Sequence, residues 1–253
     1  MNIKKTAVVF GSTQGIGLEL TRGLLSDDRF SYIFASHRPS SSTNELLALK
    51  ETFPNKLELL PFDTESMDKF TGISRAIESK TKAIDLVVNC IGALSIGSSG
   101  PERSLKEFEV NSFLQAIQTN TTPTLLIAKH LESFLKQTGE SVFISLSAKV
   151  GSLEDNKTGG WYSYRISKAA LNMAIKNLSI EFNRFGKGCS FIAVHPGTTE
   201  TKLSQPFLKA AANKYVIHSP AETAQNILKI AFSPEVHAHN GKFISWDGQE
   251  IPW

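Results

Sequence analysis

The feature that most constrains this chain is the alternation, from one end to the other, of a short apolar run and a longer amphipathic stretch. The runs are rich in β-branched residues and apolar on both faces, which is typical of strands covered by helices on either side. They are Thr6–Phe10, Tyr32–Ala35, Leu57–Leu60, Ile84–Val88, Ser141–Leu146, Phe191–Val194 and Phe243–Ile244. The alternation predicts an α/β fold, a doubly wound parallel sheet of about seven strands with helices on both faces.

The amphipathic stretches between these runs have the spacing of helices. Ile16–Leu25, Leu125–Leu135 and Ser163–Phe182 each place apolar residues on one helical stripe. Ser219 followed by Pro220 indicates a helix start, with serine as the N-cap and proline in the first turn. Because the alternation never stops and no linker divides the chain, we expect residues 1–253 to form a single domain.

Composition excludes several classes of protein. The 27 Lys and Arg residues nearly balance 24 Asp and Glu residues and do not cluster with aromatic residues, so nucleic acid and membranes are poor candidates as partners. Cys90 and Cys189 lie far apart in apolar stretches, and no Cys/His cluster has metal-ligand spacing, so we expect no metal site and a reducing compartment. No signal-peptide core or membrane-length apolar run is present, which predicts a cytoplasmic protein.

In a doubly wound sheet, ligands bind at the carboxyl ends of the strands, so the turns after the strands should carry the chemistry. The first turn is rich in glycine and leads into a helix. It reads Gly11-Ser12-Thr13-Gln14-Gly15-Ile16-Gly17. Glycines let the backbone approach a pyrophosphate, and the N–H groups of the helix that follows bind anions. The spacing differs from the general dinucleotide fingerprint, and a purely structural turn is the alternative.

The second turn bears on which dinucleotide binds. An acidic residue at this place would hold the 2′-hydroxyl of an NAD ribose, whereas a basic residue accommodates the 2′-phosphate of NADP. The second strand runs out into Ser36, His37 and Arg38, with no carboxylate in reach. We therefore expect NADP(H) to be preferred, with His37 and Arg38 at the ribose, although NAD(H) stays open because Arg38 could be a solvated loop residue.

The turns after the third and fourth strands offer further contacts to a nucleotide. Asp63 follows the third strand, and Asn89-Cys90-Ile91-Gly92 follows the fourth. Asp63 could accept a hydrogen bond from an adenine amino group, and the later turn could line the adenosine side of a cleft. Each motif is common in ordinary turns, so the two are informative only because they lie at the ends of successive predicted strands.

Tyr164 and Lys168 are the candidate catalytic pair. Four residues apart on a helix, their side chains share a face. A cation beside a tyrosine stabilises the phenolate and lowers the phenol pKa toward neutrality, which makes the phenol useful as a proton donor or acceptor. A surface pair with the same spacing is the alternative reading.

These motifs, taken in order with Asn120, a serine upstream of Tyr164 and His195-Pro196-Gly197, resemble the short-chain dehydrogenase/reductase family over essentially the whole chain. The segments 151–165 and 246–253 resemble its C-factor-like subgroup more narrowly. The resemblance implies a Rossmann-type fold, a nicotinamide cofactor and a catalytic set of Asn, Ser, Tyr and Lys.

Carried onto this chain, the resemblance implies that Tyr164 exchanges a proton with the substrate oxygen while Lys168 lowers the tyrosine pKa and bonds the nicotinamide ribose. Asn120 would anchor a water linking Lys168 to solvent. The segment Pro196-Gly197 would shape the nicotinamide pocket, and Thr201 would contact the cofactor's carboxamide or diphosphate.

The serine is the weakest part of the match. If Gly151 is aligned with the family's glycine, Ala148 takes the place of the catalytic serine and Ser147 precedes it. A shift of one residue restores Ser147, which we expect to polarise the substrate oxygen; an absent or displaced serine is the alternative.

Two functions follow. The first is an NADP(H)-dependent oxidoreductase that interconverts a carbonyl and a secondary alcohol of a small molecule, and the second is an NADP(H)-binding signalling or regulatory protein with little or no turnover. We expect residues 198–215, which include Leu203, Pro206 and Phe207, to form an apolar substrate lid. The long helices around 125–135 and 163–182 are expected to pair copies of the chain into a homodimer or homotetramer.

Overall fold

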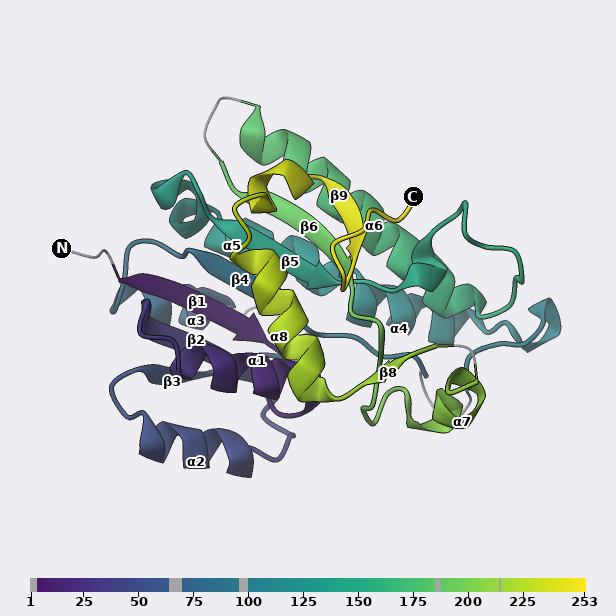
Figure 1. Ribbon diagram of the computed structural model, residues 1–253, viewed down its shortest axis with the longest axis horizontal. Coiled ribbons are helices and arrows are strands. Elements are labelled where there is room, and N and C mark those ends of the chain that lie inside the picture. Colours follow the sequence, from purple (N-terminus) through teal and green to yellow (C-terminus); the bar gives the residue numbers. More distant parts are fainter. Residues whose placement is uncertain (1–3, 64–69, 96–99, 185–187, 214) are drawn as a thin grey trace.

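A computed structural model describes residues 4–63, 70–95, 100–184, 188–213 and 215–253. Its centre is a parallel sheet of seven strands in the order β3-β2-β1-β4-β5-β6-β9 (Figure 1). The strands are β1 (Lys5–Phe10), β2 (Phe30–His37), β3 (Leu57–Pro61), β4 (Leu86–Asn89), β5 (Val142–Leu146), β6 (Ser190–His195) and β9 (Lys242–Ser245). A separate parallel pair joins β7 (Thr198–Thr199) to β8 (Ile217–His218). The α/β fold with a seven-stranded parallel sheet is therefore confirmed.

Helices cover both faces of the sheet (Figure 1). They are α1 (Gly15–Leu25), α2 (Asn44–Thr52), α3 (Phe70–Glu78), α4 (Val110–Asn120), α5 (Thr122–Thr138), α6 (Tyr162–Asn183), α7 (Leu208–Ala211) and α8 (Pro220–Ala231). The serine N-cap expected before α8 is present, since the Ser219 side chain accepts a hydrogen bond from the backbone N–H of Glu222.

The core consists of two apolar layers, one on each face of the sheet. Ala7 and Val9 of β1 pack in the layer that includes residues of α1, α2 and α8, whereas Val8 and Phe10 pack in the layer that includes residues of α3, α5 and α6. Alternate residues of a strand point to opposite faces, so a central strand must be apolar throughout. All four of these side chains are fully buried.

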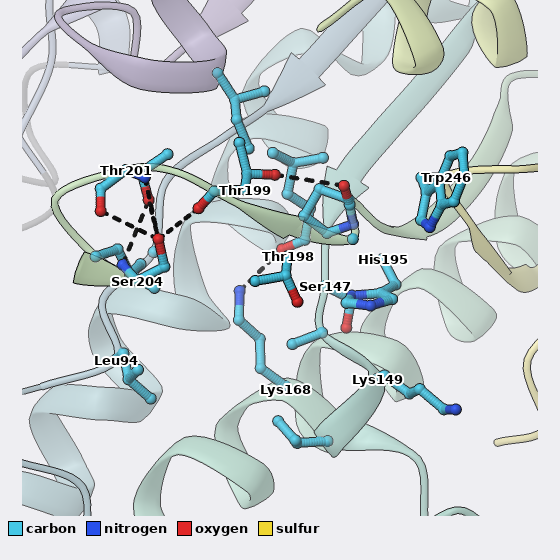
Figure 2. Close-up of a pocket in the computed structure, with 18 of the residues that line it drawn as sticks. Leu94, Ser147, Lys149, Lys168, His195, Thr198, Thr199, Thr201, Ser204 and Trp246 are labelled. Atoms are coloured by element: carbon cyan, nitrogen blue, oxygen red, sulfur yellow. Dashed lines mark hydrogen bonds between the residues drawn. The ribbon is translucent and has the colours of Figure 1, made fainter. Parts of the chain in front are cut away.

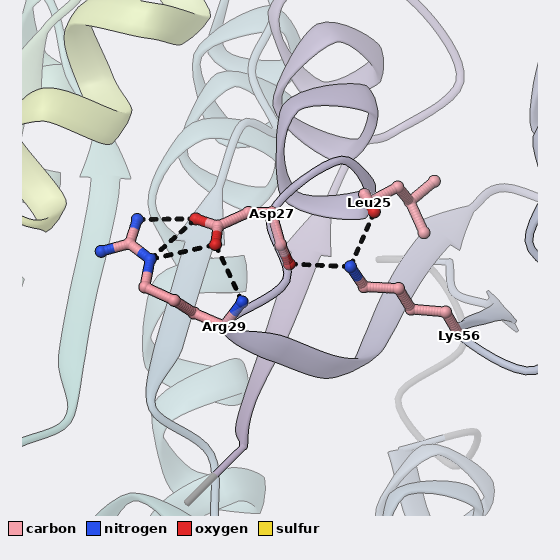
Figure 3. Close-up of polar contacts among 4 residues, drawn as sticks. All are labelled: Leu25, Asp27, Arg29 and Lys56. Atoms are coloured by element: carbon pink, nitrogen blue, oxygen red, sulfur yellow. Dashed lines mark hydrogen bonds and ion pairs between the residues drawn. The ribbon is translucent and has the colours of Figure 1, made fainter. Parts of the chain in front are cut away.

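Polar contacts hold the turn that leads from α1 into β2 (Figure 3). Asp27 pairs with Arg29, and Lys56 donates through Nζ to the carbonyl oxygens of Leu25 and Asp27 at 2.7 and 2.8 Å. The Arg29 guanidinium lowers the pKa of Asp27, and burial lowers the pKa of Lys56. Lys56 thereby supplies a donor to the Leu25 carbonyl at the end of α1 and to the Asp27 carbonyl in the turn that follows.

The strand order reverses direction between β1 and β4. From β1 the chain builds outward through β2 and β3, and from β4 it builds the other way through β5, β6 and β9. A ligand cleft is expected at such a switch point, beyond the carboxyl ends of the strands.

Candidate active site

The glycine turn between β1 and α1 is built around two close backbone approaches. Gly11 and Gly15 have φ values of +81° and +56°, and a Cβ on Gly17 would lie 2.2 Å from the carbonyl oxygen of Gly11. Only glycine fits these positions without moving the backbone. The turn therefore brings the N-terminus of α1 to the rim of a cavity of about 550 Å³.

Most residues predicted to hold a nucleotide line this first cavity. They are Gly11, Thr13, Gly15, Ile16, Gly17, His37, Arg38, Asp63, Cys90, Ile91, Gly92 and Thr201. Backbone N–H groups at a helix start and an exposed arginine suit a phosphorylated ligand. The glycine turn and the cavity that it borders therefore fit a dinucleotide.

Ser12 and Asn89 do not line the cavity but hold its rim in place. The Ser12 hydroxyl donates to the carbonyl oxygen of Val9 at 2.8 Å. Asn89 donates through Nδ2 to Thr124 and Ser145 and accepts from the N–H of Ile91 at 3.1 Å. Both side chains are fully buried, so their role in this structure is to fix the strand ends.

A second cavity of about 510 Å³ adjoins the first, since the two share lining residues at the end of β4, among them Cys90 and Gly92. Its lining contains the predicted catalytic residues Ser147, Tyr164 and Lys168, together with Pro196, Gly197 and Thr201, and this second cavity is hereafter called the catalytic cavity. Figure 2 shows Ser147, Lys168, His195 and Trp246 facing the same space. Most of the residues predicted to bind the cofactor or to act in catalysis therefore line two neighbouring cavities at the switch point.

Tyr164 and Lys168 are both buried and lie one turn apart on α6. The Lys168 Nζ lies 5.8 Å from the centre of the Tyr164 ring and donates to the carbonyl oxygen of Leu146 at 2.9 Å. Burial lowers the pKa of Lys168 to about 8 and raises the pKa of Tyr164. The expected lowering of the tyrosine pKa is not seen here, because removal of the phenol from water raises its pKa.

Asn120 lies at the break between α4 and α5 and is fully buried rather than exposed to either cavity. Its amide oxygen accepts from the N–H of Ala93 at 2.7 Å, and its Nδ2 donates to the Ala93 carbonyl and the Ser167 hydroxyl at 2.9 Å each. Gly92 separates it from the lysine: a Cβ there would lie 3.2 Å from Lys168 Nζ and 3.4 Å from Asn120 Oδ1.

Ser147 lines the catalytic cavity, but its hydroxyl is already engaged. It donates to the amide oxygen of Asn172 at 2.6 Å, one turn beyond Lys168 on α6. Ala148 lines the same cavity and brings no hydroxyl. The two positions that the sequence comparison offers for the catalytic serine, Ser147 and Ala148, are therefore adjacent residues just beyond β5.

Thr201 stands where the two cavities meet. It lines both of them, and a Cβ on Gly15 would touch its Cγ2 at 3.4 Å. Its hydroxyl lies 3.2 Å from the Ser204 hydroxyl, which also bonds the Thr199 carbonyl. These contacts, drawn in Figure 2, fix the start of the segment expected to act as a lid.

Sequence reasoning missed Glu102, which is buried and holds the start of α6. Its carboxylate accepts hydrogen bonds from the N–H and hydroxyl of Ser163, the residue before Tyr164. No local pattern marks an acid 61 residues upstream as a partner of that helix. Trp246, which lines the catalytic cavity, was likewise given no role.

Two kinds of feature are absent from the described part of the chain. No helix there is long and apolar enough to cross a membrane. No group of three or more His, Cys, Asp or Glu side chains is arranged there to hold a metal ion.

Two relatives match most of this chain. An uncharacterized oxidoreductase of Schizosaccharomyces pombe is 26% identical over 260 residues, covering 98% of each chain. The C-signal protein of Myxococcus xanthus is 26% identical over 175 residues, which cover 68% of this chain and 95% of that protein. This second relative agrees with the resemblance to the C-factor-like subgroup.

Solved structures confirm the fold. Carbonyl reductase Sniffer of D. melanogaster superposes with a TM-score of 0.84 at 23% identity, covering 99% of this chain and 100% of that one. A structure described as a short-chain dehydrogenase/reductase from Burkholderia multivorans with bound NADP gives a TM-score of 0.79 at 18% identity, with 99% and 100% covered. The family model for short chain dehydrogenases matches residues 5–212, and the chain therefore belongs to this family of oxidoreductases.

Proposed function

We propose that this protein is an NADP(H)-dependent oxidoreductase that interconverts a carbonyl and a secondary alcohol by hydride transfer. The observation that carries the proposal is that Tyr164 and Lys168 line a cavity that adjoins the one bordered by the glycine turn. A protein that only binds a nucleotide has no need of a buried phenol and ammonium beside the nucleotide. We therefore favour an enzyme over an NADP(H)-binding signalling protein.

NADP(H) would be held by the first cavity and would supply or accept the hydride. The N–H groups at the start of α1 face the diphosphate in this proposal, and Arg38 pairs with the 2′-phosphate. Arg38 is exposed and lines the cavity, and no ion pair to it is found among the described residues. Its guanidinium is thus available for a phosphate.

Tyr164 acts on the substrate oxygen. Burial raises the pKa of the phenol, so the side chain is protonated at neutral pH and can donate its proton to a carbonyl oxygen that gains negative charge. In the opposite direction, the phenolate must take the proton from an alcohol. At neutral pH Tyr164 is therefore in the protonated state that the reduction of a carbonyl requires.

Lys168 stabilises the phenolate that is left when Tyr164 gives up its proton. With a pKa of about 8, Lys168 is mostly an ammonium at pH 7. Its bond to the Leu146 carbonyl holds Nζ within the cavity, and in this proposal the ammonium also bonds the nicotinamide ribose. Asn120 holds the turn at Ala93 in place, and Gly92 lies between Asn120 and Lys168. In this proposal a water held at this turn connects Lys168 to solvent.

Ser147 is our proposed second donor to the substrate oxygen. Its hydroxyl must turn from Asn172 toward the cavity to do so, which exchanges one hydrogen bond for another. A donor aimed at a developing oxyanion is commonly worth about 3 kcal/mol in the transition state.

The protein is also proposed to act as a homodimer or homotetramer. Ile166, Met173 and Ile180 recur every seven residues on α6 and are 44%, 60% and 55% exposed, and Val110 and Leu114 on α4 are also exposed. A stripe of this kind suits self-association of two copies through a shared helix face. Light scattering on the purified protein gives the mass of the assembly, and a monomer would contradict this part of the proposal.

The function is tested by titrating the protein with NADPH and then following NADPH absorbance with a panel of aldehydes and ketones. We expect tight binding of NADPH, and turnover that Tyr164→Phe abolishes while cofactor affinity is retained. Tight binding with no turnover of any carbonyl compound would favour the non-catalytic alternative.

A further inference from the structure

The backbone that leads into the catalytic helix is strained at one residue. Gly159, Gly160 and Trp161 all lie in the left-handed region, with φ values of 63°, 66° and 52°. Trp161 is the one residue other than glycine with positive φ among those the structure describes. A side chain makes this conformation unfavourable, so its presence at an active site points to a role for that side chain.

Neighbouring residues hold Trp161 in this conformation. Its N–H donates to the carbonyl oxygen of Glu102 at 2.5 Å, and its own carbonyl accepts from the N–H of Arg165 at 2.8 Å. The Arg165 guanidinium donates to the carbonyls of Gly160 and Val150 at 3.1 and 3.2 Å. The strained turn is therefore fixed from both sides before any ligand binds.

The result of this arrangement is the position of the indole ring. The Trp161 ring lies 6.3 Å from the Tyr164 ring, edge to face, and 5.1 Å from the Phe207 ring. Trp161 and Phe207 are both only partly buried, so each leaves ring surface available to a ligand. Phe207 belongs to the segment expected to form the lid, so the two rings flank the approach to the catalytic phenol.

Apart from Lys168 and a few hydroxyl groups and His195, most of the surface that lines the cavity is apolar. Trp246 and Tyr215 add two further aromatic rings to its lining. Lys149 and Asp155 also line it, but they pair with each other at 3.3 Å. A cavity of about 510 Å³ with this lining suits a neutral, flat and apolar molecule better than an anion or a sugar.

We propose that the substrate is a neutral carbonyl compound whose carbonyl group is attached to an aromatic ring, and that Trp161 and Phe207 hold this ring beside Tyr164. The inference rests on the proposed function and specifies its substrate class. Aromatic rings attract one another edge to face beyond what their buried area provides, so the pair distinguishes an aromatic ring from a saturated ring of similar size.

The test uses two ketones with the same carbon skeleton, 1-phenylethanone and 1-cyclohexylethanone. Conjugation with the ring changes the intrinsic reactivity of 1-phenylethanone in every protein. The informative quantity is therefore the preference, kcat/KM for the aromatic ketone over kcat/KM for the saturated one, compared between the wild type and a variant. Trp161→Gly is the main variant, because glycine adopts positive φ readily and the turn should keep its shape. Trp161→Phe is the conservative replacement.

We expect Trp161→Gly to lower the preference for the aromatic ketone about three- to tenfold, and Trp161→Phe to retain most of it. Leu153→Ala is a matched control, because Leu153 is 78% exposed in the neighbouring loop and does not line the cavity. An unchanged ratio in Trp161→Gly, with both ketones reduced by the wild type, would overturn the inference and leave the proposed function standing.

A binding measurement separates the two proposals if turnover fails. Quenching of tryptophan fluorescence in the NADP-saturated protein gives Kd for each ketone, and we expect the aromatic ketone to bind about three- to tenfold more tightly than its saturated counterpart. That preference should be lost in Trp161→Gly. Equal affinities in the wild type would contradict the proposed contact of Trp161 and Phe207 with an aromatic ring, whether or not the protein catalyses a reaction.

Discussion

The ammonium nitrogen of Lys168 lies 5.8 Å from the centre of the Tyr164 ring, and protein encloses both side chains. Burial acts on both, because it disfavours the charged form of each: it raises the pKa of Tyr164 and lowers the pKa of Lys168 to about 8. At neutral pH the pair is therefore a neutral phenol beside an ammonium, the protonation state required for carbonyl reduction.

This pairing predicts how reduction depends on pH. Below about 8 the Lys168 amine holds its proton, and above that value it loses it, so kcat/KM should fall about tenfold per pH unit above pH 8. Steady-state rates at saturating NADPH from pH 6 to 10 measure the profile. In Lys168→Arg the residual activity should show no such fall, since a guanidinium stays charged. A wild-type profile that is flat to pH 10 would contradict the role of Lys168.

The exposed guanidinium of Arg38 predicts the choice of cofactor. Arg38→Ala should raise Kd for NADPH about ten- to a hundredfold, since hydrogen bonds to charged groups contribute roughly 1.5 to 3 kcal/mol, and should leave Kd for NADH nearly unchanged. Calorimetry with both nucleotides measures this. Arg184→Ala removes an exposed arginine that lines neither cavity and serves as the control. Equal affinities for the two nucleotides, unaffected by Arg38→Ala, would rule out the phosphate contact.

The hydrogen bond from Ser147 to Asn172 predicts a separation of stability from rate. Ser147→Ala and Asn172→Ala both break this bond and should each lower the free energy of unfolding, by about 1 kcal/mol or more. Only Ser147→Ala should also lower kcat, by about a hundredfold, because it alone removes the donor to the substrate oxygen. Urea unfolding and kcat are measured for each.

If both variants lower kcat equally, Ser147 only positions α6. In that case the hydroxyl should be sought at the neighbouring position, and Ala148→Ser would be the variant that raises the rate.

His195 predicts a loss of stability in acid. It lines the catalytic cavity, its Nδ1 is buried with no hydrogen-bond partner among the residues that the structure describes, and burial lowers its pKa to about 4 from 6.5. Between these values the unfolded chain binds a proton that the folded protein excludes, so the contribution is complete above pH 6.5 and is lost as pH falls toward 4.

The size of this loss follows from the shift. At pH 4.5, it should amount to roughly 2 to 3 kcal/mol relative to pH 7, at about 1.4 kcal/mol per pKa unit. Urea unfolding of the wild type and of His195→Gln at both pH values isolates the loss of stability due to His195, which should be absent from the variant. The same pH dependence in both proteins would show that His195 does not contribute.

The strands were the most predictable part of the molecule. Each predicted run overlaps an observed strand. A central parallel strand must be apolar on both faces, and neighbouring residues such as Val8 and Val9 do pack into opposite core layers. The boundaries were less predictable. The predicted run from Ile84 begins before β4, because the Asp85 carboxylate accepts from the N–H of Thr6 at 2.7 Å and the strand starts only at Leu86.

The site was predictable where local spacing defines the contact. The Gly11–Gly17 turn and the pair Tyr164 and Lys168 depend on neighbours in sequence, and the structure brings both to adjoining cavities. Glu102, which bonds Ser163, was missed because that contact is set by tertiary packing. The direction of the Tyr164 pKa was also missed, since it depends on burial, which spacing on a helix does not reveal.

The central claim is that hydride transfer to a carbonyl depends on the Tyr164 proton. The most direct measurement is single-turnover transfer of deuterium to a ketone from NADPH that carries deuterium at both C4 positions of the nicotinamide, with the alcohol product analysed by mass spectrometry. Wild type should place one deuterium on the carbinol carbon, and Tyr164→Phe should do so about 10² to 10⁴ times more slowly with unchanged Kd for NADPH. Transfer at the same rate in both proteins, or none in the wild type with NADPH bound, would contradict the account.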